Sequence, residues 1–300
     1  MMIKSGKYKD RPALIVESDT LRAVLLPEDG AKLASLVRLC DGKELLAVKP
    51  DAYYRRLTYD GSYVDSECSA FDDMFPTIDP YVPEAGPYAG IPYPDHGEVC
   101  RRPFEAAVYW DRVVLTVRSQ LFPITYQKTV APASDGGIDI SYRIENCADH
   151  PFPFVWAGHI MLRGEDGMCL LTPFENGAAT EMMFCTDGYE PQTLPRDRLT
   201  GFAPDTGAAY KFYYLDKLPA GYFGVRYSDG CHLMFTFDAE KLPYLGVWLN
   251  NGAFQGTYTI APEPCTAPFD APHKAAGRGY SSVIEPMDVF ECSLHIHITD

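Results

Sequence analysis

The sequence has 300 residues, of which 46% are hydrophobic and 22% are charged, a composition typical of a globular protein with a sizeable core. Its 26 Lys and Arg residues against 41 Asp and Glu residues give a formal net charge of −15 at pH 7. This acidic balance repels polyanions, so it argues against nucleic acids and anionic membrane surfaces as partners.

Nine cysteines are scattered along the chain without a CxxC pair. An odd number at wide spacing is typical of reduced packing residues rather than of a disulfide framework or a zinc knuckle. No apolar stretch has the length of a signal segment at the N-terminus or of a membrane span elsewhere. We therefore expect a soluble, cytoplasmic protein.

Six segments alternate apolar and polar residues and are rich in β-branched and aromatic side chains, a pattern that predicts strands. Turn residues bound them, as in DGG at 135–137 and SDG at 228–230. Helical periodicity over ten or more residues is scarce, and the nearest candidate is a short stretch after Pro195. In chain order the predicted strands are 21–26, 113–122, 138–144, 223–228, 232–237 and 292–298.

Short strands with frequent turns over this length predict an all-β protein of stacked antiparallel sheets. No internal repeat or low-complexity linker divides the chain, so we expect a single domain, 1–300. Two long stretches, 50–100 and 172–208, lack alternation and are rich in Pro, Gly, Tyr, Phe and Asp. Loops of that length are usually functional or have hidden structure, so we expect binding surface there.

Motifs for nucleotides and metals are missing. The chain has no GxxxxGK[ST] loop, no GxGxxG turn opening a helix and no HExxH pair. His295 and His297 alternate with apolar residues near the C-terminus like an H-x-H metal pair, but no third ligand is suggested nearby, which favours a solvated strand face. We expect neither a cofactor nor a metal.

His96 lies in the loop PDHGEVC, residues 94–100, between Asp95 and Glu98 and before a glycine. A glycine lets the backbone turn or approach a ligand closely, and a histidine between carboxylates can exchange protons near neutral pH. The alternative is an ordinary surface-loop histidine, which on residue type alone is the commoner case.

His159 lies in the apolar segment VWAGHIML. Strand alternation puts it on the face of Val155 and Ala157, so it points to the interior or to a cavity. A buried histidine needs a hydrogen-bond partner, which a catalytic site or the core can supply.

Glu263 lies where the strand GTYTI runs into Pro262, Pro264 and Pro268. Proline removes a backbone donor, so we expect the segment to leave the sheet as a stiff loop with Glu263 at its rim. The other Glu-Pro pair, Glu285-Pro286, opens the last strand and is expected to face solvent. Glu263 is therefore the better candidate for a base.

Several segments carry a family resemblance when they are taken in order. Residues 21–46 form a strand pair, and a loop with the pair His96-Gly97 follows. Segment 144–162 leads through a Pro-aromatic stretch to His159, segment 245–271 ends a late strand in Glu-Pro, and 284–298 forms a final Pro-turn and strand. In this order and spacing the chain resembles the aldose 1-epimerase (galactose mutarotase-like) family along nearly all of its length.

The resemblance implies a large antiparallel β-supersandwich and the interconversion of the α and β anomers of an aldose without a cofactor. It implies Glu263 as general base, His159 as general acid, and His96 as the histidine that helps to hold the ring oxygen and hydroxyls. The chain departs from the family in two places. The acidic and aromatic segment 69–79 replaces an arginine-containing one, and Met287 stands where glycine is usual.

The substrate-binding candidates are carboxylates, cations, an amide and aromatics that could contact a sugar, although aromatics usually belong to the core. They are Asp72, Asp73, Glu98, Arg101, Trp156, Trp248 and Asn250.

Three hypotheses remain open. The first is an aldose mutarotase acting on a free sugar, with a base and an acid on either side of the hemiacetal. The second is a hexose-6-phosphate mutarotase in which Arg101 or Arg102 binds the phosphate. The third is a catalytically silent sugar-binding protein. In each case we expect a small-molecule sugar partner and a monomer or homodimer.

Overall fold

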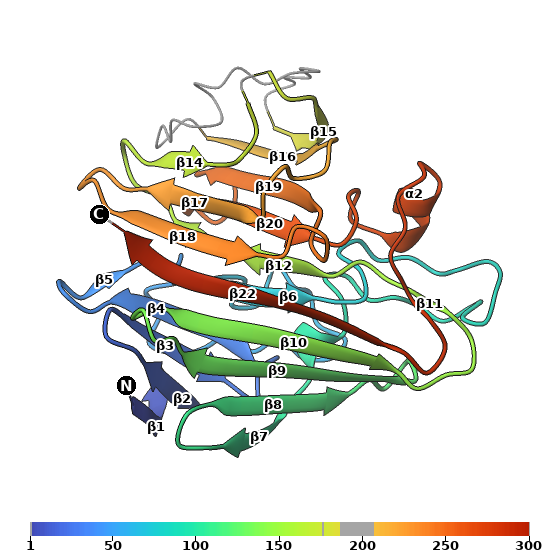
Figure 1. Ribbon diagram of the computed structural model, residues 1–300, viewed down its shortest axis with the longest axis horizontal. Coiled ribbons are helices and arrows are strands. Elements are labelled where there is room, and N and C mark those ends of the chain that lie inside the picture. Colours follow the sequence, from blue (N-terminus) through green and yellow to red (C-terminus); the bar gives the residue numbers. More distant parts are fainter. Residues whose placement is uncertain (1, 176, 187–206, 300) are drawn as a thin grey trace.

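The computed structural model describes residues 2–175, 177–186 and 207–299. These residues form sheets of twelve, eight and two strands, with antiparallel pairing between neighbouring strands, and the two large sheets are layered one in front of the other (Figure 1). The predicted all-β class with large antiparallel sheets is thus confirmed. Within the described residues, no helix is long and apolar enough to cross a membrane.

The twelve-stranded sheet has the order β1-β2-β3-β4-β6-β12-β20-β19-β16-β15, with β5 added at β4 and β13 at β20. Its strands are β1 (Met2–Tyr8), β2 (Arg11–Glu17), β3 (Leu21–Leu26), β4 (Lys32–Arg38), β5 (Lys43–Glu44), β6 (Phe71–Met74), β12 (Ala157–Ile160), β13 (Leu162–Arg163), β15 (Thr180–Cys185), β16 (Ala208–Tyr214), β19 (Tyr244–Asn251) and β20 (Tyr258–Cys265).

The eight-stranded sheet has the order β14-β17-β18-β22-β10-β9-β8-β7. Its strands are β7 (Glu105–Val108), β8 (Val113–Arg118), β9 (Ile124–Pro132), β10 (Ile138–Asn146), β14 (Cys169–Leu171), β17 (Tyr222–Arg226), β18 (His232–Phe237) and β22 (Val289–Thr299). The small sheet pairs β11 (Phe152–Pro153) with β21 (Val283–Ile284), and the described helices are the 3₁₀ turn η1 (Val99–Arg101) and α2 (Pro272–Ala276).

All six segments with clear alternation form strands: β3, β8, β10, β17, β18 and β22. Strand β10 shows the reason, because its residues alternate between buried and exposed positions along most of its length. The two stretches without alternation also contain strands, β6 in the first and β15 in the second. The helix candidate after Pro195 lies outside the described residues.

The hydrophobic core contains inward side chains of both large sheets. Leu25 and Leu36 of the twelve-stranded sheet and Ile140 and Leu294 of the eight-stranded sheet belong to one buried cluster, with exposed fractions of at most 1%. Burying such a side chain contributes about 1.5–3 kcal/mol. Because one face of the twelve-stranded sheet packs into this core, its other face is the one left for a binding site.

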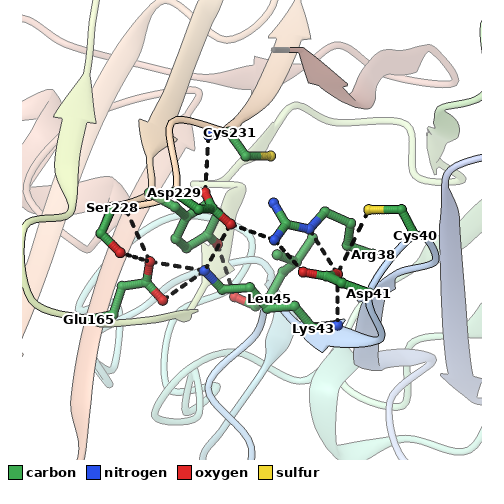
Figure 2. A network of polar contacts seen from close by, with 10 residues as sticks. Arg38, Cys40, Asp41, Lys43, Leu45, Glu165, Ser228, Asp229 and Cys231 are labelled. Atoms are coloured by element: carbon green, nitrogen blue, oxygen red, sulfur yellow. Dashed lines mark hydrogen bonds and ion pairs between the residues drawn. The ribbon is translucent and has the colours of Figure 1, made fainter.

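A polar network connects the turn around β5 with loops of the eight-stranded sheet (Figure 2). Arg38 contacts Asp41 in its own turn and Asp229 between β17 and β18, at 2.5 Å each. Lys43 lies 2.8 Å from Glu165 and 4.0 Å from the centre of the Tyr227 ring. The network thus joins the two sheets by charge as well as by apolar packing.

Candidate functional site

Strands β19 and β20 divide their side chains between the core and the outer face of the twelve-stranded sheet. Ile260 and Val247 belong to the core. Because successive side chains alternate, Glu263 and Trp248 point to the opposite face. Lys211 in β16 is directly opposite Trp248, so it shares this outer face.

His159 reaches the same face from the other side of β20. Ala157 pairs with Cys265 in the antiparallel register of β12 and β20, and continuing that register by two residues brings His159 opposite Glu263. Two segments 104 residues apart in sequence thus meet, and their side chains are in contact.

A cavity of about 500 Å³ opens on this face, a volume within the range of about 300–1,000 Å³ that is typical of small-molecule sites. It brings together residues from the loop before β6, the PDHGEVC loop and strands β12, β16, β19 and β20. Its principal lining residues are Tyr63, His96, His159, Lys211, Trp248 and Glu263.

Glu263 forms the floor of the cavity and is fully buried. Its Oε1 lies 2.7 Å from Nδ1 of His159, and its Oε2 accepts a hydrogen bond from the Lys211 ammonium. Lys211 also lies 3.5 Å from Asp270, which accepts a hydrogen bond from the Tyr213 hydroxyl. Each oxygen of Glu263 therefore has one partner and keeps a lone pair for a ligand.

The charges around Glu263 decide its ionisation. Burial acts to raise the pKa of this carboxyl, but the Lys211 ammonium and His159 outweigh burial and hold the pKa at about 2. Burial likewise opposes the charge on Lys211, and the carboxylates of Asp270 and Glu263 overcome it and raise the Lys211 pKa. Glu263 is thus a carboxylate and Lys211 an ammonium at neutral pH.

His96 forms part of the wall of the same cavity. It has a left-handed backbone, φ 58°, and its ring stacks on Tyr63 with centroids 3.9 Å apart and planes at 11°. The centroids of the His96 and His159 rings are 6.0 Å apart. Nδ1 of His96 lies 2.9 Å from Asp95 without the geometry of a hydrogen bond.

Gly97 explains why the loop takes this path. Its φ is +79°, and a Cβ there would lie 2.3 Å from the backbone oxygen of Phe75. Only glycine fits both the left-handed backbone and so close an approach. The loop is consequently pressed against the segment that follows β6, and His96 is fixed beside the cavity.

The structure brings Glu263, His159 and His96 to one cavity, together with Trp248 and Asn250. The amide of Asn250 is engaged with the turn after β19, since it donates to Phe254 O and Thr257 Oγ1 and accepts from Phe254 N. Asn250 thus shapes the cavity wall. The chemical roles of these residues remain predictions.

Asp72 and Asp73, predicted to bind sugar hydroxyls, do not line this cavity. Asp72 lies behind Tyr63, where it accepts hydrogen bonds from Tyr63 and Lys32. Asp73 is buried on the core side with Lys128 and Tyr142. Each carboxylate has a lysine and a tyrosine of the protein as partners, as a buried charge requires, although Oδ2 of Asp73 has only the ion-pair contact with Lys128.

Glu98 and Arg101 are likewise structural rather than substrate contacts. Glu98 accepts hydrogen bonds from Ser119 and from the backbone of Gln120. The Arg101 guanidinium donates to the backbone oxygens of Gly97, Tyr59, Gly61 and Asp95. Arg101 therefore holds the PDHGEVC loop in place, and this removes the basis for its proposed contact with a phosphate.

Trp156 is fully buried, and its indole donates to Tyr126 at 2.8 Å. It alternates away from the outer face, so it packs in the core instead of stacking on a sugar. The prediction that Trp156 contacts a sugar is thus wrong. Alternation of side chains along the strand places Trp156 on the core side of the sheet and His159 on the cavity side.

The expectation that Glu263 lies in a loop at the rim is also wrong, because β20 continues through both prolines to Cys265. Pro262 and Pro264 are two positions apart, so their missing N–H groups fall on one side of the strand. On the side of β12 and β13, β20 pairs at Thr259, Ile260 and Cys265 but not at the positions between. Proline is tolerated there.

Sequence reasoning missed Lys211, Asp270 and Tyr63. A signal for Lys211 was present, because one lysine interrupts the strand-forming run AAYKFYY, and a lysine on a half-buried strand needs a carboxylate. Tyr63 and Asp270 lie in irregular segments, and no periodicity marks them.

Within the described part of the chain, no group of three or more His, Cys, Asp or Glu side chains is placed to hold a metal ion. His295 of the C-terminal pair instead contacts Asp139 at 2.7 Å and Asp135 at 2.8 Å.

Two stacked antiparallel sheets of this size define the class of β-supersandwich proteins. No protein-family model matches the sequence, and no curated protein matches it. Solved structures do. The chain superposes on the Slr1438 protein from Synechocystis sp. PCC 6803 with a TM-score of 0.71 and 16% identity, covering 98% of each chain.

A galactose mutarotase-like protein from Lactobacillus casei gives a TM-score of 0.67 and 18% identity, over 96% of this chain and 100% of that one. A GalM/aldose epimerase homologue from C. elegans gives 0.59 and 16%, over 99% of each. The chain therefore has the galactose mutarotase-like fold, as the sequence resemblance implied.

Proposed function

We propose that the protein is an isomerase that interconverts the α and β anomers of an aldose by opening and reclosing the sugar ring. The observation that supports this most directly is the contact between Glu263 and His159 on the floor of a cavity that His96 also lines. A carboxylate and an imidazole side by side in a cavity are the groups that acid–base catalysis requires.

Ring opening moves two protons on one hemiacetal. The C1 hydroxyl gives its proton to a base, the bond between C1 and the ring oxygen breaks, and the ring oxygen takes a proton from an acid. The product is an aldehyde, which rotates about the C1–C2 bond and recloses on either face. In the proposal Glu263 is the base and His159 the acid.

The geometry is consistent with these roles. The carboxylate of Glu263 is ionised at neutral pH and keeps free lone pairs. Nδ1 of His159 faces Glu263, so Nε2 is the ring nitrogen left for the sugar. His96, which lines the same cavity, can hold the ring oxygen or a hydroxyl, and its stacking on Tyr63 fixes its plane.

A second function, sugar binding without catalysis, is favoured by one specific feature. Both oxygens of Glu263 are engaged by His159 and Lys211, and a carboxylate with a pKa of about 2 is a weaker base than one tuned toward neutrality. The same assay separates the two functions, because a binder shows saturable sugar binding without faster mutarotation.

The test follows the equilibration of freshly dissolved α-D-glucose and α-D-galactose by polarimetry or NMR. We expect acceleration over buffer, and a loss of roughly 10²-fold or more in Glu263→Gln and in His159→Asn. Glu285→Gln and His232→Asn are the matched controls, since Glu285 precedes a proline on the surface and His232 lies in the other sheet. Near-normal rates in both site variants would contradict the assigned roles.

A further inference from the structure

Three large aromatic side chains meet at the outer end of the cavity. Phe184 of β15, Trp248 of β19 and Phe254 of the turn after β19 have ring centroids 5.8, 5.8 and 5.4 Å apart. None of the three belongs to the main hydrophobic core. Phe184 is 41% exposed and Phe254 42%. An exposed apolar cluster in a cavity that also holds charged groups is a typical ligand contact.

The cluster has a defined position relative to Glu263. Trp248 is opposite Ala261, two residues along β20 from Glu263, so roughly 7 Å separates the two positions along the strand. Phe184 is opposite Lys211, one strand further toward the sheet edge. A sugar whose C1 lies at Glu263 would fill this interval with its own ring.

The chemistry of the outer end differs from that of the floor. The floor carries the charges of Glu263, Lys211 and Asp270, whereas the outer end offers aromatic faces. The amide of Asn250 there is already bonded to Phe254 and Thr257. A neutral ring with an apolar C–H face suits such a surface, because aromatic faces stack on it without needing hydrogen bonds.

We propose that Phe184, Trp248 and Phe254 form a stacking subsite for the second ring of a 1→4-linked reducing disaccharide whose C1 lies at Glu263. The proposal rests on the proposed anomer interconversion. A 1→4 linkage fits because O4 is across the pyranose ring from C1, so the second ring extends away from Glu263 toward the aromatics. A 1→2 linkage would direct it back over the charged floor.

The experiment compares mutarotation of glucose with that of maltose and cellobiose in the wild-type protein. We expect kcat/KM for at least one disaccharide to exceed that for glucose about tenfold, which is equivalent to about 1.4 kcal/mol. In Trp248→Ala and Phe254→Ala this ratio should fall toward one. Trp110→Ala is the control, because Trp110 is 91% exposed and lies beside β7 in the other sheet, and it should leave the ratio unchanged.

Phe254→Ala protects the test against misfolding, because Phe254 is a half-exposed turn residue. Binding of maltose, cellobiose and glucose by calorimetry provides an arm that does not depend on turnover. Tighter binding of a disaccharide that is lost in Phe254→Ala, with no mutarotation, sustains the subsite and refutes the proposed reaction. Mutarotation with equal rates and affinities for all three sugars refutes the subsite and sustains the reaction. No binding and no turnover with any of them refutes both.

Discussion

Replacing Lys211 by methionine removes the ammonium that contacts Oε2 of Glu263 while keeping an unbranched side chain. The pKa of Glu263 is about 2 against an ordinary value of 4.5, although burial acts to raise it. At about 1.4 kcal/mol per pH unit, this difference corresponds to roughly 3 kcal/mol in favour of the folded, ionised carboxylate. Breaking a buried ion pair costs about 3–5 kcal/mol, which agrees in size.

The dependence on pH has a definite sign. The folded protein binds the Glu263 proton more weakly than the unfolded chain does, so this stabilisation is fully present above about pH 4.5 and is lost as the pH falls toward 2. Without Lys211, burial raises the pKa of Glu263, and the loss begins at a higher pH.

Urea unfolding from pH 2 to pH 8 measures the effect, because this range covers the pH window in which the wild-type protein loses the stabilisation. We expect the free energy of unfolding of Lys211→Met to be about 3–5 kcal/mol lower than that of the wild type at pH 7. In a plot of mutarotation rate against pH, we expect the fall on the acidic side to move to higher pH in this variant. Lys274→Met is the matched control for stability, because the pair of Lys274 with Asp79 is about 40% exposed and is worth at most about 1 kcal/mol. A Lys211→Met variant whose free energy of unfolding lies within about 1 kcal/mol of wild type, and whose mutarotation rate falls at the same acidic pH, would refute this account.

Two further substitutions test the positions of the site and the core. Gly97→Ala places a Cβ 2.3 Å from the Phe75 oxygen. We therefore expect the free energy of unfolding, measured in urea, to fall by more than about 1 kcal/mol, and sugar binding to weaken. Wild-type behaviour would show that the position of His96 does not depend on this turn. Asp73→Asn leaves Lys128 buried without its carboxylate. The free energy of unfolding should therefore fall by about 3–5 kcal/mol, while the folded variant keeps its sugar specificity. A changed specificity would mean that Asp73 reaches the cavity.

The strands that the sequence predicts well are those with one face exposed to solvent. In β10 and β18 buried and less buried residues alternate, and alternation is the signal that sequence reasoning reads. Strand β6 was missed because all four of its residues, FDDM, are buried. Its two aspartates look like loop residues until Lys32 and Lys128 are known to pair with them.

The candidate site was predictable in part for the same reason. His159 carried a parity signal, and alternation along its strand indicated a cavity or the interior. Trp156 lies on the opposite face of this strand from His159, so the same alternation would have placed it in the core. Lys211 required a long-range partner, Glu263, that no local pattern names, because the register between β16, β19 and β20 is set only when the sheet assembles.

Strand β20 contributes to both the hydrophobic core and the cavity, which lie on opposite faces of the twelve-stranded sheet. Ile260 on one face anchors the core, while Glu263 on the other forms the floor of the cavity, so a one-residue slip of register would bury a carboxylate among leucines and expose the core. The prolines at 262 and 264 sit where β20 lacks pairing on its β12 side, and they cannot donate to a further strand there. The gap in pairing lies beside Glu263, whose side chain contacts His159 of β12 across it.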